Sequence, residues 1–142
     1  KLSGPKQIEN IDRWLEESAV KTEREVELLT KSFSFYKALI TVWDFINQAN
    51  KYIDTTAPWT LAKQAATRDR LETVLFNSAA SLRVAALLLW PYMPGSAEQI
   101  CTQLALNNPL SAKPITDNIN FSFLKPKGSI KKAEPLFPRI EQ

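Results

Sequence analysis

The chain has 142 residues, of which 44% are hydrophobic and 23% are charged, a composition typical of a single globular domain with its own core. It contains no histidine, which excludes histidine-based acid–base catalysis, Ser-His-Asp triads and most zinc sites. Lysine and arginine exceed aspartate and glutamate by 18 to 15, a surplus that permits a polyanionic partner without requiring one.

Scarce glycine (three residues) and frequent proline (nine) favour helices separated by proline stops, so we expect an all-α fold, a helical bundle of about four to five helices. Residues 6–31 have apolar side chains every three or four positions, which predicts a first helix and leaves room for a break near Ser18. Residues 33–53 predict a second helix with a wide apolar stripe, in which Trp43 is expected to belong to the core.

Residues 57–65 predict a short third helix. Thr55 or Thr56 can cap it, and Pro58 suits its first turn, where a missing N–H costs nothing. Ala57 precedes a proline and is therefore expected to be extended, which would separate this helix from the one before it.

Residues 68–90 predict the longest helix, with Thr67 as its N-cap and Asp69 in its first turn. After Arg83 the pattern is apolar on all sides, so we expect the helix to be surrounded by other helices or by a domain outside this chain. The expected core face consists of Leu71, Val74, Leu75, Leu82, Ala85, Ala86 and Leu89.

Residues 96–105 predict a last helix, which begins with "SAEQ", a capping-box pattern formed by Ser96 and Gln99. From Asn107 onward the helical pattern ends. We therefore expect a helical bundle over residues 1–106 and, over residues 107–142, an irregular C-terminal tail that packs back on it. The expected apolar anchors of this tail are Phe121, Phe123, Leu136, Phe137 and Ile140.

The cysteine content and the apolar segments bear on the cellular compartment of the protein. Cys101 is the only cysteine, which excludes an internal disulfide and fits a reducing compartment. The longest apolar run, residues 84–90, is far shorter than the ~20 residues that a membrane-spanning helix needs, and no signal peptide is visible. We expect a cytoplasmic protein with no membrane partner. Because the sequence begins with "KLSGPKQ" and not with methionine, we also expect a fragment or a processed piece.

No catalytic constellation emerges from the residues. Asp12, Glu16 and Glu17 lie on a charged helix without the apolar surroundings that a catalytic carboxyl needs. The serine and threonine residues have no base partner. "KPKGSIKK" contains one glycine, too few to cradle a phosphate, and its lysines are typical of a solvated loop.

The stretch "NKYIDTTAPWTLAK", residues 50–63, is the best candidate for a site. Trp59 is expected at a helix N-terminus, and Lys63, four residues later, would lie on the same face. An aromatic ring beside a positive charge suits an unstacked nucleotide base with its phosphate. The alternative is that Trp59 packs on the preceding helix and Lys63 is an ordinary surface charge.

Three stretches resemble a known family. "ANKYIDTTAPWTLAK" resembles the anticodon-binding domain of methionyl-tRNA synthetases, which are class I aminoacyl-tRNA synthetases. "SLRVAALLLWPYMPGSAEQI" is similar to the family's long helix, proline-flanked stop and following helix, and "KKAEPLFPRIEQ" is similar to its closing segment. They occur in the family's order and cover about residues 30–140. Another class I synthetase could share the bundle and the proline break, but the first and third stretches point to methionine.

The resemblance implies a helical bundle that binds the tRNA anticodon loop with specificity for CAU. In the family, the tryptophan of the "APW" motif stacks on an anticodon base and the lysine after it lies near the loop. Those positions are Trp59 and Lys63 here. Asn50 and Asp54 also match the motif and complete the expected RNA-binding set, with shaping of the turn favoured over base contact.

The family's catalytic motifs, of the HIGH and KMSKS types, have no match, and neither does the first helix of its anticodon domain, which carries an asparagine and an arginine that help to read the bases. The resemblance therefore implies that this chain binds no cofactor and that ATP, with magnesium, is used by a catalytic domain of the same parent chain. The expected partners are methionine-specific tRNA and that catalytic domain. The competing hypothesis is a helical protein–protein interaction module whose exposed apolar seam docks a partner.

Overall fold

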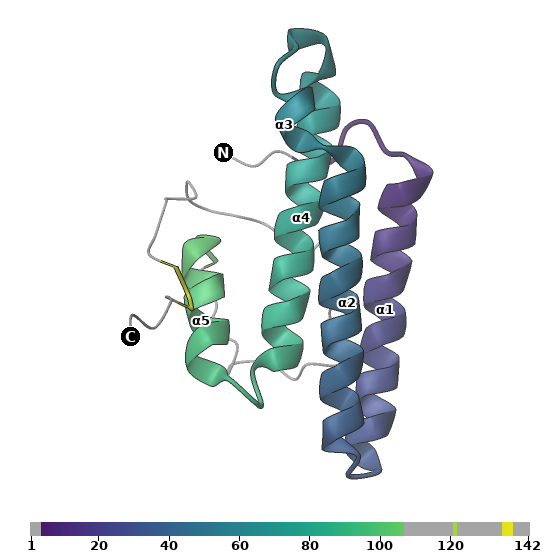
Figure 1. Cartoon of the computed structure of the whole chain (residues 1–142), viewed down its shortest axis with the longest axis vertical. Coiled ribbons are helices and arrows are strands. Elements are labelled where there is room, and N and C mark those ends of the chain that lie inside the picture. Colours follow the sequence, from purple (N-terminus) through teal and green to yellow (C-terminus); the bar gives the residue numbers. More distant parts are fainter. Residues whose placement is uncertain (1–3, 107–120, 122–134, 138–142) are drawn as a thin grey trace, which may run out of the picture.

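The structure, a computed structural model, describes residues 4–106, 121 and 135–137 (Figure 1). This described part contains helices and no strand, which confirms the predicted all-α class. The elements, in chain order, are α1 (Asn10–Lys31), α2 (Phe35–Thr56), α3 (Pro58–Leu61), the 3₁₀ helix η1 (Ala65–Thr67), α4 (Arg68–Leu89) and α5 (Pro94–Gln103).

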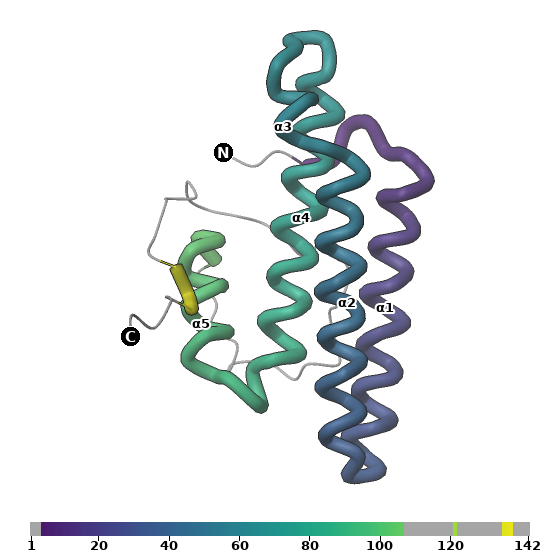
Figure 2. The backbone as a smooth tube through the Cα atoms, viewed as in Figure 1, coloured from purple at the N-terminus to yellow at the C-terminus, as the bar shows by residue number. Residues whose placement is uncertain are grey.

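Three long helices, α1, α2 and α4, run side by side and enclose the main core, and α5 packs against α4 (Figure 2). The turn between α1 and α2 lies at one end of this bundle. The short helix α3 lies at the other end, where α1 begins, α2 ends and α4 begins (Figure 1). The bundle therefore brings together, at one end, three segments that are far apart in the sequence.

α1 is one continuous helix, so the predicted break near Ser18 is wrong. A buried stripe runs through it without interruption, and this stripe includes two polar residues, Asp12 and Thr22. The helix also begins later than residue 6. The backbone N–H groups of Lys6 and Gln7 donate to the hydroxyl of Thr73 on α4, at 3.0 and 3.2 Å, which holds this segment outside the helix.

α2 buries a narrower face than its apolar pattern predicts. Its buried residues are Ala38, Val42, Phe45 and Tyr52. Trp43 is 46% exposed, so its predicted core role is wrong. Trp43 follows Val42 directly, and one step along a helix rotates a side chain by about 100°, away from the face that Val42 buries.

α4 is the most thoroughly buried helix. Its last turns, Val84–Leu89, are buried on all sides, which confirms that other helices surround it. Its predicted core face is partly wrong, because Leu75 is 44% and Leu82 50% exposed, whereas Phe76 is buried. By length and composition Ala65–Leu89 could cross a membrane, but 67% of its apolar window is buried inside the bundle, as in an ordinary core helix.

The last helix of the described chain begins earlier than predicted. α5 begins at Pro94, with Met93 before it, so the predicted capping box of Ser96 and Gln99 does not form. Phe121 is buried in the main core, as expected of an anchor, whereas Phe137 is 65% exposed and does not act as one. The remaining predicted tail, with Phe123 and Ile140, lies outside the described residues, and the division at residue 106 stays a prediction.

Within the described residues, three helices end at a residue in the left-handed region that is not glycine: Phe33, Ala57 and Ala105. After α5, Ala105 has φ 56°, its N–H donates to Thr102 O, and Leu106 N–H donates to Cys101 O, both at 3.0 Å. These paired bonds form a Schellman motif, whose left-handed position favours glycine. A side chain there costs about 1–2 kcal/mol.

We expect Ala105→Gly to raise the free energy of unfolding by about 0.5–1 kcal/mol. Glycine removes the left-handed penalty at an entropic cost of about 0.5–1 kcal/mol in the unfolded chain. Ala49→Gly, within right-handed α2, is the matched control and should destabilise the domain by about 1 kcal/mol. Chemical denaturation measures both variants, and a destabilised Ala105→Gly protein would contradict the account of this turn.

Candidate nucleic-acid interface

The chain turns from α2 into α3 through one left-handed residue, Ala57, with φ 43° and ψ 62°. The Ala57 N–H donates to Ile53 O at 2.9 Å, and the Thr60 N–H donates to Ala57 O at 2.8 Å. The predicted extended conformation of Ala57 is therefore wrong. The residue avoids the right-handed helical region that the following proline disfavours, but it enters the left-handed region and so joins the two helices without a spacer.

The predicted threonine cap of α3 does not form, because α2 extends through both threonines. The hydroxyl of Thr56 donates back to Tyr52 O at 2.7 Å, within α2. Pro58 occupies the first turn of α3, as predicted. The turn is therefore held by backbone hydrogen bonds and by the end of α2.

Trp59 is 56% exposed. This exposure contradicts the alternative in which its ring packs into the bundle on the preceding helix. Trp59 lies on α3, which is one turn long and contains no buried residue. The ring is therefore available to a partner at the end of the bundle.

Lys63 is exposed, but it does not lie on one continuous helix with Trp59. The predicted helix over residues 57–65 divides into α3 and η1, with Lys63 in the turn between them. Thr67 is the N-cap residue of α4, as predicted, but its side chain accepts no hydrogen bond from the helix. Its hydroxyl instead donates to Leu61 O at 2.6 Å and to Gln64 O at 3.0 Å. Thr67 therefore fastens the turn that carries Lys63.

Asn50 and Asp54 lie four residues apart on the last turns of α2, and both are exposed. Residues four apart share one side of a helix. The structure thus places Asn50, Asp54, Trp59 and Lys63 on the exposed surface of one end of the bundle. Among the described contacts, the hydrogen bonds that shape the turn come from the backbone and from Thr56 and Thr67, and not from Asn50 or Asp54.

Behind this surface lies a buried polar cluster that the sequence analysis did not identify. It consists of Asp12 on α1, Tyr52 on α2, and Arg70 and Asn77 on α4, all of which are buried. Asp12 Oδ1 accepts from Tyr52 Oη at 2.5 Å and from Asn77 Nδ2 at 3.0 Å. Asp12 Oδ2 accepts from Arg70 Nη1 at 2.6 Å and from the Glu9 N–H at 2.6 Å.

The prediction that Asp12 lacks apolar surroundings on a charged helix is therefore wrong, because Asp12 is buried. A signal was present in the register: Asp12 falls three residues before Leu15 and seven before Ala19, on the face that α1 buries. Arg70 and Asn77 likewise fall seven residues apart on α4. Polar residues that recur in an apolar register indicate partners across the core, although they do not say which.

The cluster also determines the protonation states of Asp12 and Tyr52. Burial by itself would raise the pKa of Asp12, but the hydrogen bonds from Arg70, Tyr52 and the Glu9 backbone outweigh it and hold that pKa below its ordinary value. Burial and the hydrogen bond to Asp12 raise the pKa of the Tyr52 phenol. Asp12 is thus a carboxylate that accepts, and Tyr52 is a neutral phenol that donates.

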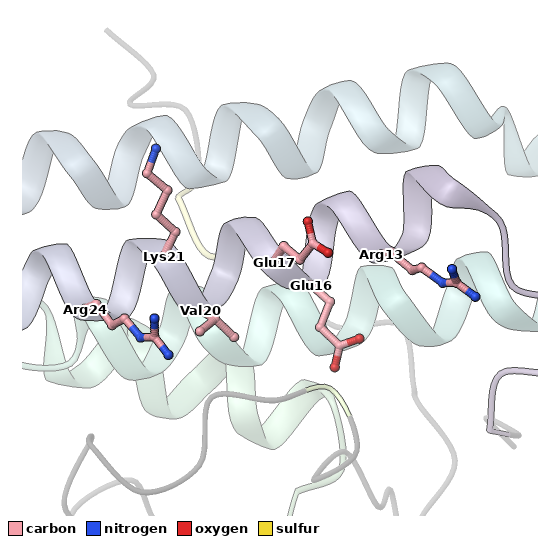
Figure 3. A pocket seen from close by; sticks show the side chains of 6 residues that line it. All are labelled: Arg13, Glu16, Glu17, Val20, Lys21 and Arg24. Atoms are coloured by element: carbon pink, nitrogen blue, oxygen red, sulfur yellow. The ribbon is translucent and has the colours of Figure 1, made fainter.

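Two hollows among the described residues lie away from the exposed turn. One, of about 490 Å³, is lined by six residues of α1, whose charged side chains point in different directions (Figure 3). A larger one, of about 650 Å³, lies toward the α1–α2 turn, between α1 and the residues Phe35, Leu88, Pro91 and Tyr92. Within residues 4–106, 121 and 135–137, no group of three or more cysteine, aspartate or glutamate residues is arranged to hold a metal ion.

A family model described as the anticodon-binding domain of tRNA ligase matches residues 12–137. The chain belongs to this family. The anticodon-binding domain is 39% identical over 140 residues to the methionine–tRNA ligase of Caldanaerobacter subterraneus subsp. tengcongensis. The aligned region covers 99% of this chain and 22% of that relative. The domain is 37% identical over 134 residues to the methionine–tRNA ligase of Bacillus subtilis, with coverage of 94% and 20%. The chain therefore spans about a fifth of the length of these relatives.

Solved structures agree with the sequence comparisons. The anticodon-binding domain superposes on the apo methionyl-tRNA synthetase of Mycobacterium tuberculosis with a TM-score of 0.85 and 27% identity, over 100% of this chain and 28% of that one. A structure of the same enzyme in complex with methionyl-adenylate matches with a TM-score of 0.83 and 26% identity, over 97% of this chain and 27% of that one. The predicted family is confirmed.

Asp12→Ala should lower the free energy of unfolding by about 3–5 kcal/mol, because Arg70 would lose its buried carboxylate partner and keep only the exposed carboxylate of Glu9. Glu17→Ala, on the exposed face of the same helix, is the control and should change stability by less than about 0.5 kcal/mol. Urea unfolding at neutral pH measures both, and a loss below about 1 kcal/mol for Asp12→Ala would contradict the importance of the cluster.

The difference between wild type and Asp12→Ala should also depend on pH. Because the folded-state pKa of Asp12 is lowered, its stabilisation is fully present above the unfolded-state pKa of about 3.9 and is lost as the pH falls toward the folded-state pKa. Repeating the unfolding measurements between neutral and acidic pH tests this. A difference that grows on acidification would be the wrong sign.

Proposed function

We propose that this chain is the anticodon-binding domain of a methionine–tRNA ligase and that it binds the anticodon loop of methionine-specific tRNA, with the anticodon CAU. The observation that carries the proposal is the exposed Trp59 ring on α3, directly after the turn from α2, in a chain whose relatives are methionine–tRNA ligases. A large ring left at the surface, where its burial would have stabilised the fold, indicates a partner with a flat apolar face.

We propose a division of roles among the four exposed residues. Trp59 stacks on an anticodon base, and Lys63 contacts a phosphate of the loop. Asn50 and Asp54 face solvent on the same side of α2, where an amide and a carboxylate can hydrogen-bond to base edges. This role replaces the shaping of the turn that the motif alone favoured, since neither side chain takes part in the hydrogen bonds that hold the turn.

The parent chain is proposed to charge its tRNA with methionine using ATP and magnesium. That chemistry is assigned to a catalytic domain outside this chain, because this chain spans about a fifth of its relatives and a related enzyme binds methionyl-adenylate. At the end of the bundle opposite to α3, Phe33, Phe35 and Tyr36 are exposed. A cytoplasmic location fits the free thiol of Cys101.

The exposed aromatic residues also support the competing function, a protein–protein interaction module. The two functions predict a different dependence of binding on salt concentration. RNA binding through phosphates weakens steeply as salt rises, because binding releases counterions from the RNA. Filter binding of methionine tRNA to the parent enzyme at low and moderate salt therefore separates them, and the absence of any tRNA binding would leave the interaction module as the better account.

In the parent enzyme, Trp59→Ala should raise KM for tRNA, or lower kcat/KM, by about 5- to 150-fold, the equivalent of one base–aromatic stack of about 1–3 kcal/mol. Methionine-dependent ATP–pyrophosphate exchange and the melting temperature should change little, because the ring is exposed. Trp59→Phe should retain part of the function, since a smaller ring still offers a face.

The matched control is Trp43→Ala, which removes another half-exposed tryptophan from the middle of α2 and should leave tRNA kinetics unchanged. A well-folded Trp59→Ala enzyme with wild-type tRNA kinetics would refute the stacking role.

Lys63→Ala should weaken cognate and non-cognate tRNA alike, and should reduce the slope of log K against log salt by about one unit, as expected of a phosphate contact. Lys37→Ala, an exposed lysine near the opposite end of the bundle, is the control and should leave the slope unchanged. If only the cognate tRNA binds more weakly, Lys63 contacts a base and the assignment to a phosphate is wrong.

A further inference from the structure

The buried cluster of Asp12, Tyr52, Arg70 and Asn77 lies at the same end of the bundle as the exposed turn (Figure 1). We propose that this cluster is a positioning set for tRNA binding: it locks the end of α2 against α1 and α4, and thereby holds the turn that presents Trp59. The proposal rests on the proposed function of that turn. None of the four residues needs to touch RNA, because all are buried.

The connection from the cluster to Trp59 runs through the last turn of α2. The Tyr52 side chain is fixed by Asp12, while its backbone carbonyl accepts the Thr56 hydroxyl. The next carbonyl, that of Ile53, accepts the Ala57 N–H that forms the left-handed turn. A rotation or shift of this last turn would therefore move the junction from which α3 and Trp59 project.

A second connection runs through the start of α4. Arg70 lies one turn after Thr67, whose hydroxyl is bonded to Leu61 O at the end of α3. The Arg70 guanidinium donates to Asp12 and to Gln7 O at 3.1 Å, and its Nε lies 3.1 Å from Glu9 Oε1. α3 is thus fastened at both ends to helices whose positions Asp12 sets.

The chemistry of the cluster fits positioning better than stability alone. A buried ion pair loses hydration energy, and apolar residues of similar volume often give equal or greater stability. Apolar contacts, however, tolerate small rotations of one helix against another. Each oxygen of the Asp12 carboxylate instead accepts two directional bonds, from a phenol, an amide, a guanidinium and a backbone N–H, which fixes one arrangement of three helices.

The test uses Tyr52→Phe in the full-length parent enzyme, which removes one buried hydroxyl and keeps the ring in the core. We expect KM for tRNA to rise by about 2- to 30-fold, the range for residues that act on a binding site without touching the ligand. Methionine-dependent ATP–pyrophosphate exchange should stay at the wild-type rate. Asn77→Ala, which removes the amide that donates to both Asp12 and Tyr52, is the second variant should the first fold poorly.

A spectroscopic measurement distinguishes positioning from a general loss of stability. In enzyme labelled with 5-fluorotryptophan, the ¹⁹F signal of Trp59 is identified by its absence in Trp59→Phe. In Tyr52→Phe we expect this signal to shift or broaden without tRNA present. Two controls lie toward the other end of the bundle: Tyr92→Phe, which removes a phenol bonded to Phe35 O, and Val26→Ala, which destabilises the core there. Both should leave the Trp59 signal and KM for tRNA unchanged.

The outcomes separate the two proposals. A raised KM and an altered Trp59 signal in Tyr52→Phe, with both controls unaffected, support positioning. Wild-type KM and signal in Tyr52→Phe, alongside an impaired Trp59→Ala enzyme, overturn the positioning set and leave the proposed function standing. An equal rise of KM in Val26→Ala also overturns it, since any loss of stability would then suffice. Wild-type tRNA kinetics in Trp59→Ala would overturn both.

Discussion

The carboxylate of Asp12, buried between three helices, is the interaction on which the arrangement of this domain depends. It lies near the start of α1 and accepts hydrogen bonds from Tyr52 near the end of α2 and from Arg70 near the start of α4. Removing a charged group from water is costly, and the cost is met only when every lone pair has a donor in the right direction. This requirement leaves little freedom in how the three helix ends meet.

That constraint explains how the ordered end of the bundle can carry the exposed ring of Trp59. Loops that carry function are usually mobile, and precise recognition needs support from ordered elements. Here the turn after α2 is short, is closed by backbone hydrogen bonds through Ala57, and is tied to α4 by the hydroxyl of Thr67. Trp59 is therefore exposed on a helix whose junctions with α2 and α4 are held by hydrogen bonds.

The two ends of the bundle have different characters, which suits a domain that works within a longer chain. One end presents polar side chains and Trp59 over a buried, charged and hydrogen-bonded cluster. The other end presents Phe33, Phe35 and Tyr36 beside an apolar hollow of about 650 Å³. Exposed apolar surface of this kind is typical of contacts with another protein surface, whereas an aromatic ring among polar groups is typical of contacts with unstacked bases.

The sequence by itself determined the helical class, the extents of the long helices to within a few residues, and the stretch that contains the candidate site. These features depend on local information: apolar spacing, proline stops, the absence of histidine, and the motif around Trp59. Tertiary structure decided which of the apolar residues on each helix are buried. Trp43 and Leu82 satisfy an apolar period as well as true core residues do, but neighbouring helices do not cover them. It also decided that Asp12 is buried, since its three side-chain partners lie 40, 58 and 65 residues away in sequence, and a carboxylate becomes a stable core residue only when folding brings its donors to it.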